Sequence, residues 1–245
     1  MSPVVGLVCD VVPGAAMIGR VQPLPHGYSH DTRGDGAIVV KRYQGPHADD
    51  RRSTEQLMLS RLAGGVLPVP HLIDAPAGAL RMRHVAGVHG QDLIAAGHTA
   101  PVLRSCGRTL RELQDIEPSA VLDDVPGGTR TVLVHGDYGP NNMLFDPATH
   151  ATTAIIDWEW AHAGDPVEDL AWCEWIIRMH HPEVVDHLPE LFDGYGGHPT
   201  WTSRQDAMLT KCHEMLGLFR PAGLAAGTQR WRRHIEITRQ WSEKA

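Results

Sequence analysis

Short apolar runs, bounded by glycine, proline and polar residues, make up most of the first third of the chain. Three of these runs predict β-strands, over residues 37–43, 69–73 and 79–85. Between the first two, apolar residues recur at helical spacing over residues 47–62, and the Gly64-Gly65 pair that follows is typical of a helix end. The first third is therefore expected to form a small sheet with one helix.

The pattern changes in the rest of the chain, where helical spacing extends over longer segments. Apolar periodicity predicts helices over residues 102–116 and 170–179. Between them lie short runs of apolar and β-branched residues that predict buried strands, over residues 131–134, 143–145 and 154–156. A turn sequence, Asp-Pro-Ala-Thr-His, joins the last two into an expected hairpin.

Three oxygen-bearing side chains follow these central strands. Asp137 lies in the loop after the first strand, where Gly136 permits a tight bend. Asn142 begins one strand of the hairpin and Asp157 follows the other, so the hairpin is expected to bring them side by side. One carboxylate suits a role on a hydroxyl proton, whereas an amide oxygen and a second carboxylate suit a hard divalent cation held against phosphate oxygens.

The sequence around these side chains resembles the aminoglycoside phosphotransferase family, which are small-molecule kinases of protein-kinase-like fold. His135-Gly136-Asp137, with Asn142 five residues after the aspartate, looks like the catalytic loop of that family. Residues 156–159, Ile-Asp-Trp-Glu, look like its metal-binding segment, and residues 164–171, Gly-Asp-Pro-Val-Glu-Asp-Leu-Ala, look like the segment that follows. Three motifs in order are far more specific than His-Gly-Asp alone.

The resemblance implies a fold and a reaction. The fold would be α+β and bilobal, with a small mixed lobe and antiparallel sheet at residues 1–84 and a larger, mainly helical lobe at residues 85–245. The reaction would move the γ-phosphoryl group of ATP or GTP to a hydroxyl of a small molecule. By the same resemblance Asp137 orients that hydroxyl and accepts its proton, while Asn142 and Asp157 bind Mg²⁺.

The resemblance also implies a nucleotide site in the first lobe. Lys41 looks like the lysine that binds the α- and β-phosphates, and Glu55 looks like the glutamate that holds this lysine in place. Without the other motifs, Lys41 would be interpreted as an ordinary solvent-facing strand lysine. Ser29 belongs to a loop that would lie over the nucleotide. The remaining implied contacts surround the adenine, with one side chain at the back of its pocket and backbone groups at its edge: Met82, Arg83 and Val85.

The charge distribution bears on the acceptor. The net charge is −7, and residues 157–214 carry 12 acidic and 3 basic side chains, a net of −9. An acidic second lobe would attract a polycationic acceptor such as an aminoglycoside antibiotic, but a solvated surface explains the same charge equally well. An amino alcohol, a sugar or a peptide antibiotic are further acceptor candidates. The expected acceptor contacts are Glu159, Trp160, Glu190 and Asp193.

Several side chains near the motifs have structural interpretations. Asp165, Pro166 and Glu168 form the pattern of a helix capping box. Asp169 is expected to hydrogen-bond the catalytic loop, by resemblance, and His135 is expected to be a packed support rather than a ligand or base. Two tryptophans of the following helix are more typical of a core than of cofactor stacking: Trp172 and Trp175.

Composition argues against membrane-spanning, secreted and zinc-binding proteins. No apolar run approaches the roughly 18 residues of a membrane span, and the first residues lack the pattern of a secretory signal. Neither the scattered cysteines nor the 16 histidines have the spacing of zinc ligands. Scattered cysteines also favour a reducing compartment, and the cytoplasm is therefore the expected location. Neither nucleic acid nor membrane is an expected partner, and the oligomeric state is open.

Two rival classes stay open on the sequence alone. A metal-dependent phosphohydrolase also uses clusters of Asp, Asn and His, but it gives Lys41 no role. A catalytically idle nucleotide-binding module is the other, because the segment between Tyr28 and Ala37 is short and would reduce the lid over the phosphates. ATP-dependent phosphorylation of an added hydroxyl compound separates both from a kinase.

Overall fold

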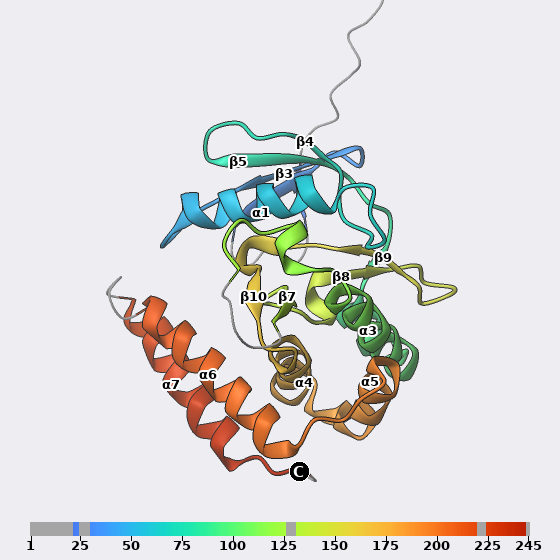
Figure 1. Cartoon of the computed structure of the whole chain (residues 1–245), viewed down its shortest axis with the longest axis vertical. Coiled ribbons are helices and arrows are strands. Elements are labelled where there is room, and N and C mark those ends of the chain that lie inside the picture. Colours follow the sequence, from blue (N-terminus) through green and yellow to red (C-terminus); the bar gives the residue numbers. More distant parts are fainter. Residues whose placement is uncertain (1–21, 25–29, 126–130, 220–223, 244–245) are drawn as a thin grey trace, which may run out of the picture.

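An antiparallel sheet forms the first part of the computed structural model, which describes residues 22–24, 30–125, 131–219 and 224–243 (Figure 1). The strand order is β1-β2-β3-β5-β4. The strands have these bounds: β1 Gln22–Pro23, β2 Asp31–Gly34, β3 Ile38–Arg42, β4 Leu72–Asp74 and β5 Ala79–Arg83. The β3 and β5 predictions are confirmed, whereas β4 begins three residues later than its apolar run, because Pro70 interrupts that run.

Helix α1, Ala48–Leu62, lies between this sheet and the rest of the molecule (Figure 1). Its bounds match the apolar spacing closely, and the chain leaves it at Gly64, which has a φ of 74°. Met58, Leu59 and Leu62 are buried on one face of α1 and join the main core. Glu55 lies among them, 1% exposed, so the helix carries one carboxylate into the interior.

Short strands form the centre of the molecule. Strands β6 (Val88–His89), β8 (Met143–Phe145) and β9 (Thr152–Ile155) make a three-stranded antiparallel sheet in the order β6-β8-β9. Met143 is registered opposite Ile155, which confirms the predicted hairpin. Strand β7, Val132–Val134, is fully buried as expected and pairs with β10, His162–Gly164.

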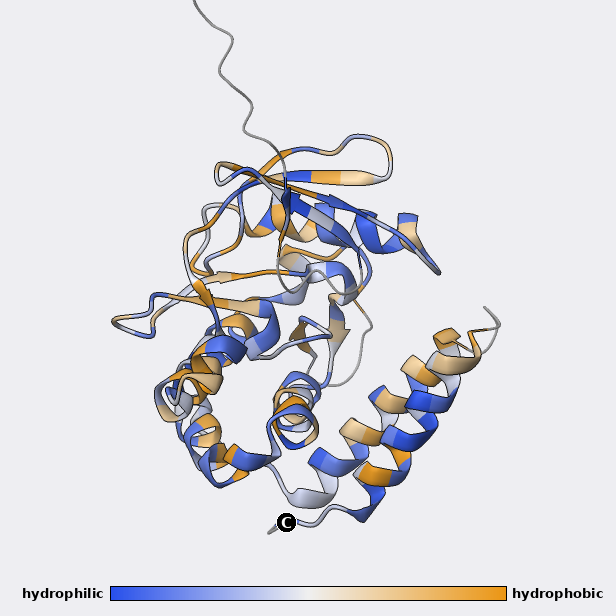
Figure 2. Cartoon of the chain, turned by 180° about the vertical axis from the view of Figure 1, so that it is seen from behind, coloured by the Kyte–Doolittle hydropathy of each residue, from blue (hydrophilic) through white to orange (hydrophobic). Residues whose placement is uncertain are grey.

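Helices make up most of the second part (Figure 1). Two packed pairs, α3 with α5 and α6 with α7, flank α4. In Figure 2 hydrophobic and hydrophilic residues alternate along these helices, as expected of helices with one buried face. Their bounds are α2 Gly90–Ala95, α3 Thr99–Gln114, α4 Val167–His180, α5 Leu188–Tyr195, α6 Trp201–Phe219 and α7 Ala225–Gln240.

Two hydrophobic cores hold this arrangement together. The larger core joins the sheet, α1, α3 and the central strands. The smaller lies between α4, α6 and α7, where the rings of Trp172 and Trp175 stack at a centroid distance of 4.3 Å. Both tryptophans are therefore core residues, as predicted. The fold is α+β with two lobes, and none of the helices in the described ranges is long and apolar enough to cross a membrane.

Glycine permits the close approach of α3 and α5. A β-carbon on Gly107 would overlap the carbonyl oxygen of Leu191, and one on Gly194 would overlap the carbonyl oxygen of Arg104. We expect Gly107→Ala to lower the free energy of unfolding by about 1–3 kcal/mol, because the two backbones must separate. Urea denaturation followed by circular dichroism measures this change.

Gly217 in α6 provides the matched control. A β-carbon there would meet no atom within 4 Å. Gly217→Ala is therefore expected to raise the unfolding free energy by about 0.5–1 kcal/mol, since alanine is the better helix former. Equal destabilisation by the two substitutions would show that crowding between α3 and α5 is not the reason for Gly107.

Candidate active site

The ammonium of Lys41 is the centre of the site. Lys41 lies near the end of β3 and is 5% exposed. Its Nζ donates to Glu55 Oε2 at 2.5 Å, contacts Asp157 Oδ1 and lies 3.5 Å from Glu159 Oε2. Burial disfavours the charged ammonium, but the carboxylates of Asp157, Glu55 and Glu159 outweigh it, so the pKa of Lys41 lies above its ordinary value.

The structure pairs Lys41 with Glu55 of α1, as the resemblance implied. Asp49 and Asp50, the other acids of that helix, are exposed. Glu55 also accepts a hydrogen bond from the hydroxyl of Tyr43, which directly follows β3. Burial raises the pKa of Glu55 even though Lys41 lowers it. The carboxylate is thus held on two sides, and it fixes the direction of the lysine.

Asp137 has both carboxylate oxygens bound. Its Oδ1 accepts from the indole nitrogen Nε1 of Trp172 at 2.8 Å, and its Oδ2 accepts from Nδ2 of Asn142 at 2.8 Å. The same amide nitrogen also donates to the backbone carbonyl of Asp137 at 2.8 Å. Burial raises the pKa of Asp137 to about 6, while the two donors oppose that rise.

The backbone of the catalytic loop is fixed from α4. Asp169 accepts hydrogen bonds from the N–H of His135 at 2.6 Å and of Gly136 at 2.9 Å. Gly136 has a φ of 82°, and a β-carbon there would overlap the carbonyl of Trp160. The ring of His135 is fully buried, with Nε2 2.9 Å from the carbonyl oxygen of Ile156. The expectations for Asp169 and His135 are confirmed.

Asn142 and Asp157 have a donor set that fits Mg²⁺. The amide nitrogen of Asn142 is used by Asp137, which leaves the amide oxygen as a possible ligand. Asp157 offers a second carboxylate oxygen besides the one on Lys41. Both residues line the same cavity, and hard oxygen donors are those that Mg²⁺ prefers. Glu55, Asp157 and Glu159 also lie within ligand range of each other, but Lys41 already supplies a cation among them.

That cavity has a volume of about 350 Å³ and lies between the lobes. Its walls include most of the residues that were predicted to bind the nucleotide: Lys41, Glu55, Met82, Arg83 and Val85. The N–H groups of Arg83 and His84 donate to the carbonyls of His71 and Ala37. The N–H of Val85 has no backbone acceptor among the residues that the structure describes, so it can bind the edge of a ligand. Ser29 lies outside the described residues.

Glu159 is buried and paired with residues of the first lobe. It is 5% exposed, with Oε2 2.5 Å from Nε2 of His30 and Oε1 3.2 Å from Nη1 of Arg51. Its carboxylate thus binds within the protein, and its expected contact with an acceptor stays a prediction. Trp160 is half-buried, and its ring centroid lies 5.4 Å from the guanidinium carbon of Arg51 and 5.5 Å from the ammonium of Lys211.

Glu190 and Asp193 line neither of the cavities beside the Asp137 loop, and their expected contact with an acceptor stays a prediction. Both belong to α5, which packs against α3. Glu190 accepts from Nε of Arg104 at 2.8 Å, and Asp193 lines a separate hollow beside Phe192. The distribution of acidic residues along the sequence does not indicate on which side of the lobe Glu190 and Asp193 lie.

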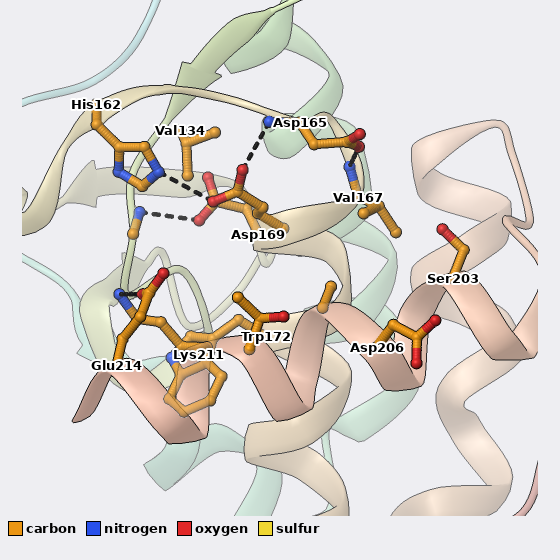
Figure 3. Close-up of a pocket in the computed structure, with 14 residues that line it drawn as sticks. Val134, His162, Asp165, Val167, Asp169, Trp172, Ser203, Asp206, Lys211 and Glu214 are labelled. Atoms are coloured by element: carbon orange, nitrogen blue, oxygen red, sulfur yellow. Dashed lines mark hydrogen bonds and ion pairs between the residues drawn. The ribbon is translucent and has the colours of Figure 1, made fainter. Parts of the chain in front are cut away.

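A second cavity, of about 450 Å³, adjoins the other side of the catalytic loop. Gly136, Asp169 and Trp172 form one wall, and α6 forms the opposite one (Figure 3). The side chains of α6 that line it are Ser203, Asp206, Thr210, Lys211 and Glu214. No sequence motif indicates these residues, because α6 reaches the loop only through the tertiary fold.

The second cavity is rich in carboxylates. Asp165, Glu168, Asp169, Asp206 and Glu214 line it, against the single lysine Lys211. Glu168 accepts from the backbone N–H of Asp165 at 2.6 Å, and Asp165 from that of Val167 at 2.9 Å, which confirms the capping box. Figure 3 shows Asp206 and Ser203 on α6, facing the start of α4.

A buried lysine–glutamate pair, a loop aspartate and an asparagine–aspartate pair in a two-lobed fold form an arrangement typical of kinase-like phosphotransferases. Residues 119–206, which hold the catalytic loop, match the family described as the phosphotransferase enzyme family. The fold is similar to aminoglycoside 2'-phosphotransferase-IIIa in its GDP complex, with a TM-score of 0.72 and 14% identity over 91% of this chain and 93% of that one. The resemblance to the aminoglycoside phosphotransferases is confirmed.

Further relatives extend the comparison. A choline/ethanolamine kinase family protein from Mesorhizobium loti has a TM-score of 0.59 and 15% identity over 93% of this chain and 94% of that one. Acyl-CoA dehydrogenase family member 10 of Mus musculus is 42% identical over 48 residues, which are 20% of this chain and 4% of that protein. The chain thus matches only a small part of that curated relative.

His135 makes stability depend on pH. Burial lowers its pKa from 6.5 to about 4, so between these values the unfolded chain binds a proton that the folded chain does not. Stability should therefore fall as pH drops from about 6.5 to about 4, with a contribution on the order of 3 kcal/mol from this group. Urea titrations at a series of pH values measure this dependence.

His135→Gln separates this effect from the other titrating groups. The variant is expected to be less stable at pH 7 but to lose less stability on acidification than the parent protein. Asp137 and Asp169, whose pKa values burial raises to about 6, act in the opposite direction and are present in both proteins. Parallel stability–pH curves for parent and variant would contradict the assignment to His135.

Proposed function

We propose that the protein transfers the γ-phosphoryl group of ATP, or of GTP, to a hydroxyl of a small molecule. The single observation that carries this proposal is the convergence of Lys41, Asp137, Asn142 and Asp157 on one cavity between the lobes. A phosphohydrolase would not need the buried Lys41–Glu55 pair. That pair is the usual device for holding α- and β-phosphates.

Each residue has a definite role in the proposed reaction. Lys41, held by Glu55, binds the α- and β-phosphates. Asp137 orients the acceptor hydroxyl and accepts its proton. Asn142 and Asp157 would hold Mg²⁺, which neutralises charge on the phosphate oxygens when bound. Because the transition state is loose, positioning and electrostatics contribute more than the strength of the base.

The base of the nucleotide would lie along the segment after β5. Met82 and Val85 line the cavity, and the N–H of Val85 would provide a donor for the base edge. We further propose that the lobes divide between residues 84 and 85, where the chain passes from the end of β5 at Arg83 to β6 at Val88. The nucleotide would then contact the connecting segment directly.

The acid-rich second cavity supports a cationic acceptor. It adjoins Gly136 and Trp172, on the opposite side of the loop from the nucleotide cavity. An amino-bearing hydroxyl compound, either an aminoglycoside or an amino alcohol, complements its carboxylates. The solved structures of similar fold include a gentamicin complex and a choline/ethanolamine kinase family protein. Phosphorylation of an antibiotic in the cytoplasm would make the protein a resistance enzyme.

A labelled-triphosphate screen tests the function as a whole. The protein is incubated with Mg²⁺, γ-labelled ATP or GTP, and a panel of aminoglycosides, amino alcohols, sugars and neutral polyols. The proposal requires label to move to a panel compound, with cationic members favoured. Binding of Mg²⁺–ATP with no transfer to any compound would favour the idle module, and hydrolysis of added phosphate esters would favour the phosphohydrolase.

Asp137→Ala is expected to lower kcat by about 10²–10⁴-fold, because the hydroxyl loses both its orientation and its proton acceptor. Nucleotide binding should survive, since Lys41 and Asp157 remain. Initial rates with the best panel compound and calorimetric titration with ATP measure the two effects. Asp124→Ala, at an exposed position, is the control, and normal turnover in Asp137→Ala would remove Asp137 from this role.

Asp157→Ala is expected to weaken nucleotide binding only when Mg²⁺ is present, because a ligand of the metal is lost. Titration of the parent and the variant with ATP, in Mg²⁺ and in EDTA, gives the Mg²⁺-dependent part of the affinity. The parent should show a clear difference between the two conditions and the variant little. An identical difference in both proteins would rule out Asp157 as a ligand.

A further inference from the structure

The indole of Trp172 provides one of the two hydrogen bonds that hold the carboxylate of Asp137. The distance from Nε1 to Oδ1 is 2.8 Å, and Asn142 occupies the other oxygen at the same distance. A carboxylate with one donor on each oxygen has its plane fixed. Without the indole, Asn142 would be the one remaining hydrogen-bond donor among the described residues to oppose rotation of the carboxylate.

The indole suits this task because of its chemistry. Its N–H is a donor only, so it cannot take the proton that Asp137 is proposed to accept. It therefore leaves the remaining lone pairs of Oδ1 and Oδ2 to the acceptor hydroxyl. Trp172 also lines the acid-rich second cavity, so the bond lies between Asp137 and the place where the acceptor would enter.

The position of the indole is itself fixed. Its ring stacks on Trp175, with an interplanar angle of 6°, and Nε1 of Trp175 donates to Oγ1 of Thr238 on α7 at 2.9 Å. Trp231 extends the same stack at a centroid distance of 6.3 Å from Trp172. A flat ring held between helices is a rigid donor, with little freedom to follow a moving carboxylate.

We propose that Trp172 is a positioning residue for the phosphoryl transfer: its indole N–H holds Oδ1 of Asp137 so that the carboxylate faces the acceptor hydroxyl. This inference rests on the proposed function. It assigns to Trp172 a task that its place in the core does not require, because a phenylalanine would fill most of the same space. The task belongs to the N–H and not to the ring.

Two substitutions remove the N–H and keep an aromatic ring. Trp172→Phe shortens the ring system, whereas Trp172→3-benzothienylalanine keeps its size and replaces the N–H by sulfur. Both should lower kcat by about 10- to 100-fold, because a misplaced reacting group is costly. The KM for the nucleotide should change by less than about twofold, because Lys41 and Asp157 are untouched.

Trp231→Phe is the matched control. It makes the same change in the same stack, but Nε1 of Trp231 is buried with no hydrogen-bond partner within the described ranges. Its kcat should stay within about threefold of the parent. The proposal is overturned if the two Trp172 variants keep the parental kcat, or if Trp231→Phe loses as much as they do.

A measurement without turnover separates this inference from the proposed function. In a ¹H–¹⁵N spectrum the indole signal of Trp172 is identified by its loss in Trp172→Phe. It should move upfield in Asp137→Ala, where its acceptor is gone, and an unmoved signal would overturn the proposal. A parent protein that transfers no phosphate would refute the proposed function, and the spectrum would still decide whether Trp172 binds Asp137.

Discussion

The buried ammonium of Lys41 joins the two lobes, and the rest of the site depends on it. Glu55 reaches it from α1 in the first lobe, and Asp157 and Glu159 reach it from the second. Burial of a carboxylate without a counter-charge would cost several kcal/mol of folding free energy. These charged groups can therefore be buried only when both lobes are in contact. Arg51 and His30 complete the charge balance by binding Glu159. Electrostatics thus fixes α1 against the turn at Trp158–Trp160.

The same cluster explains the backbone at Asp157. Its φ of 71° is unusual for a residue with a side chain, although aspartate tolerates this region better than most. The residue before it is held by the hydrogen bond from Ile156 N–H to the carbonyl of Asn142 at 3.0 Å, and its own carboxylate by Lys41. The left-handed bend turns the chain from β9 into the next turn, so that Asp157 and Glu159 both reach the lysine. A local strain is therefore offset by contacts that are far apart in the sequence.

Much of this site could be predicted from the sequence, and the reason is that its parts are local. The turn between β8 and β9 sets the register that puts Asn142 beside Asp157, and the Gly136 bend precedes Asp137 directly. Long-range placement could not be predicted in this way. The acceptor contacts expected at Glu190 and Asp193 depend on where α5 lies, and α5 packs on α3 through Gly107, a contact that no local motif indicates. A signal for Trp172 was nevertheless present, since it follows Asp169 by three residues on one helical face.

The loop aspartate separates two cavities of different chemistry, and this geometry constrains the proposed reaction. Asp137 lines the cavity that holds Lys41 and Asp157, while the loop glycine before it lines the acid-rich cavity. A cationic acceptor in the second cavity would face carboxylates, and the same carboxylates would disfavour a triphosphate there, whereas a triphosphate in the first cavity would face Lys41. The two substrates can meet only at the loop, where Asp137 is held by Trp172 from one side and Asn142 from the other. In the proposed reaction, the rigidity of that one carboxylate would then decide whether proximity becomes transfer.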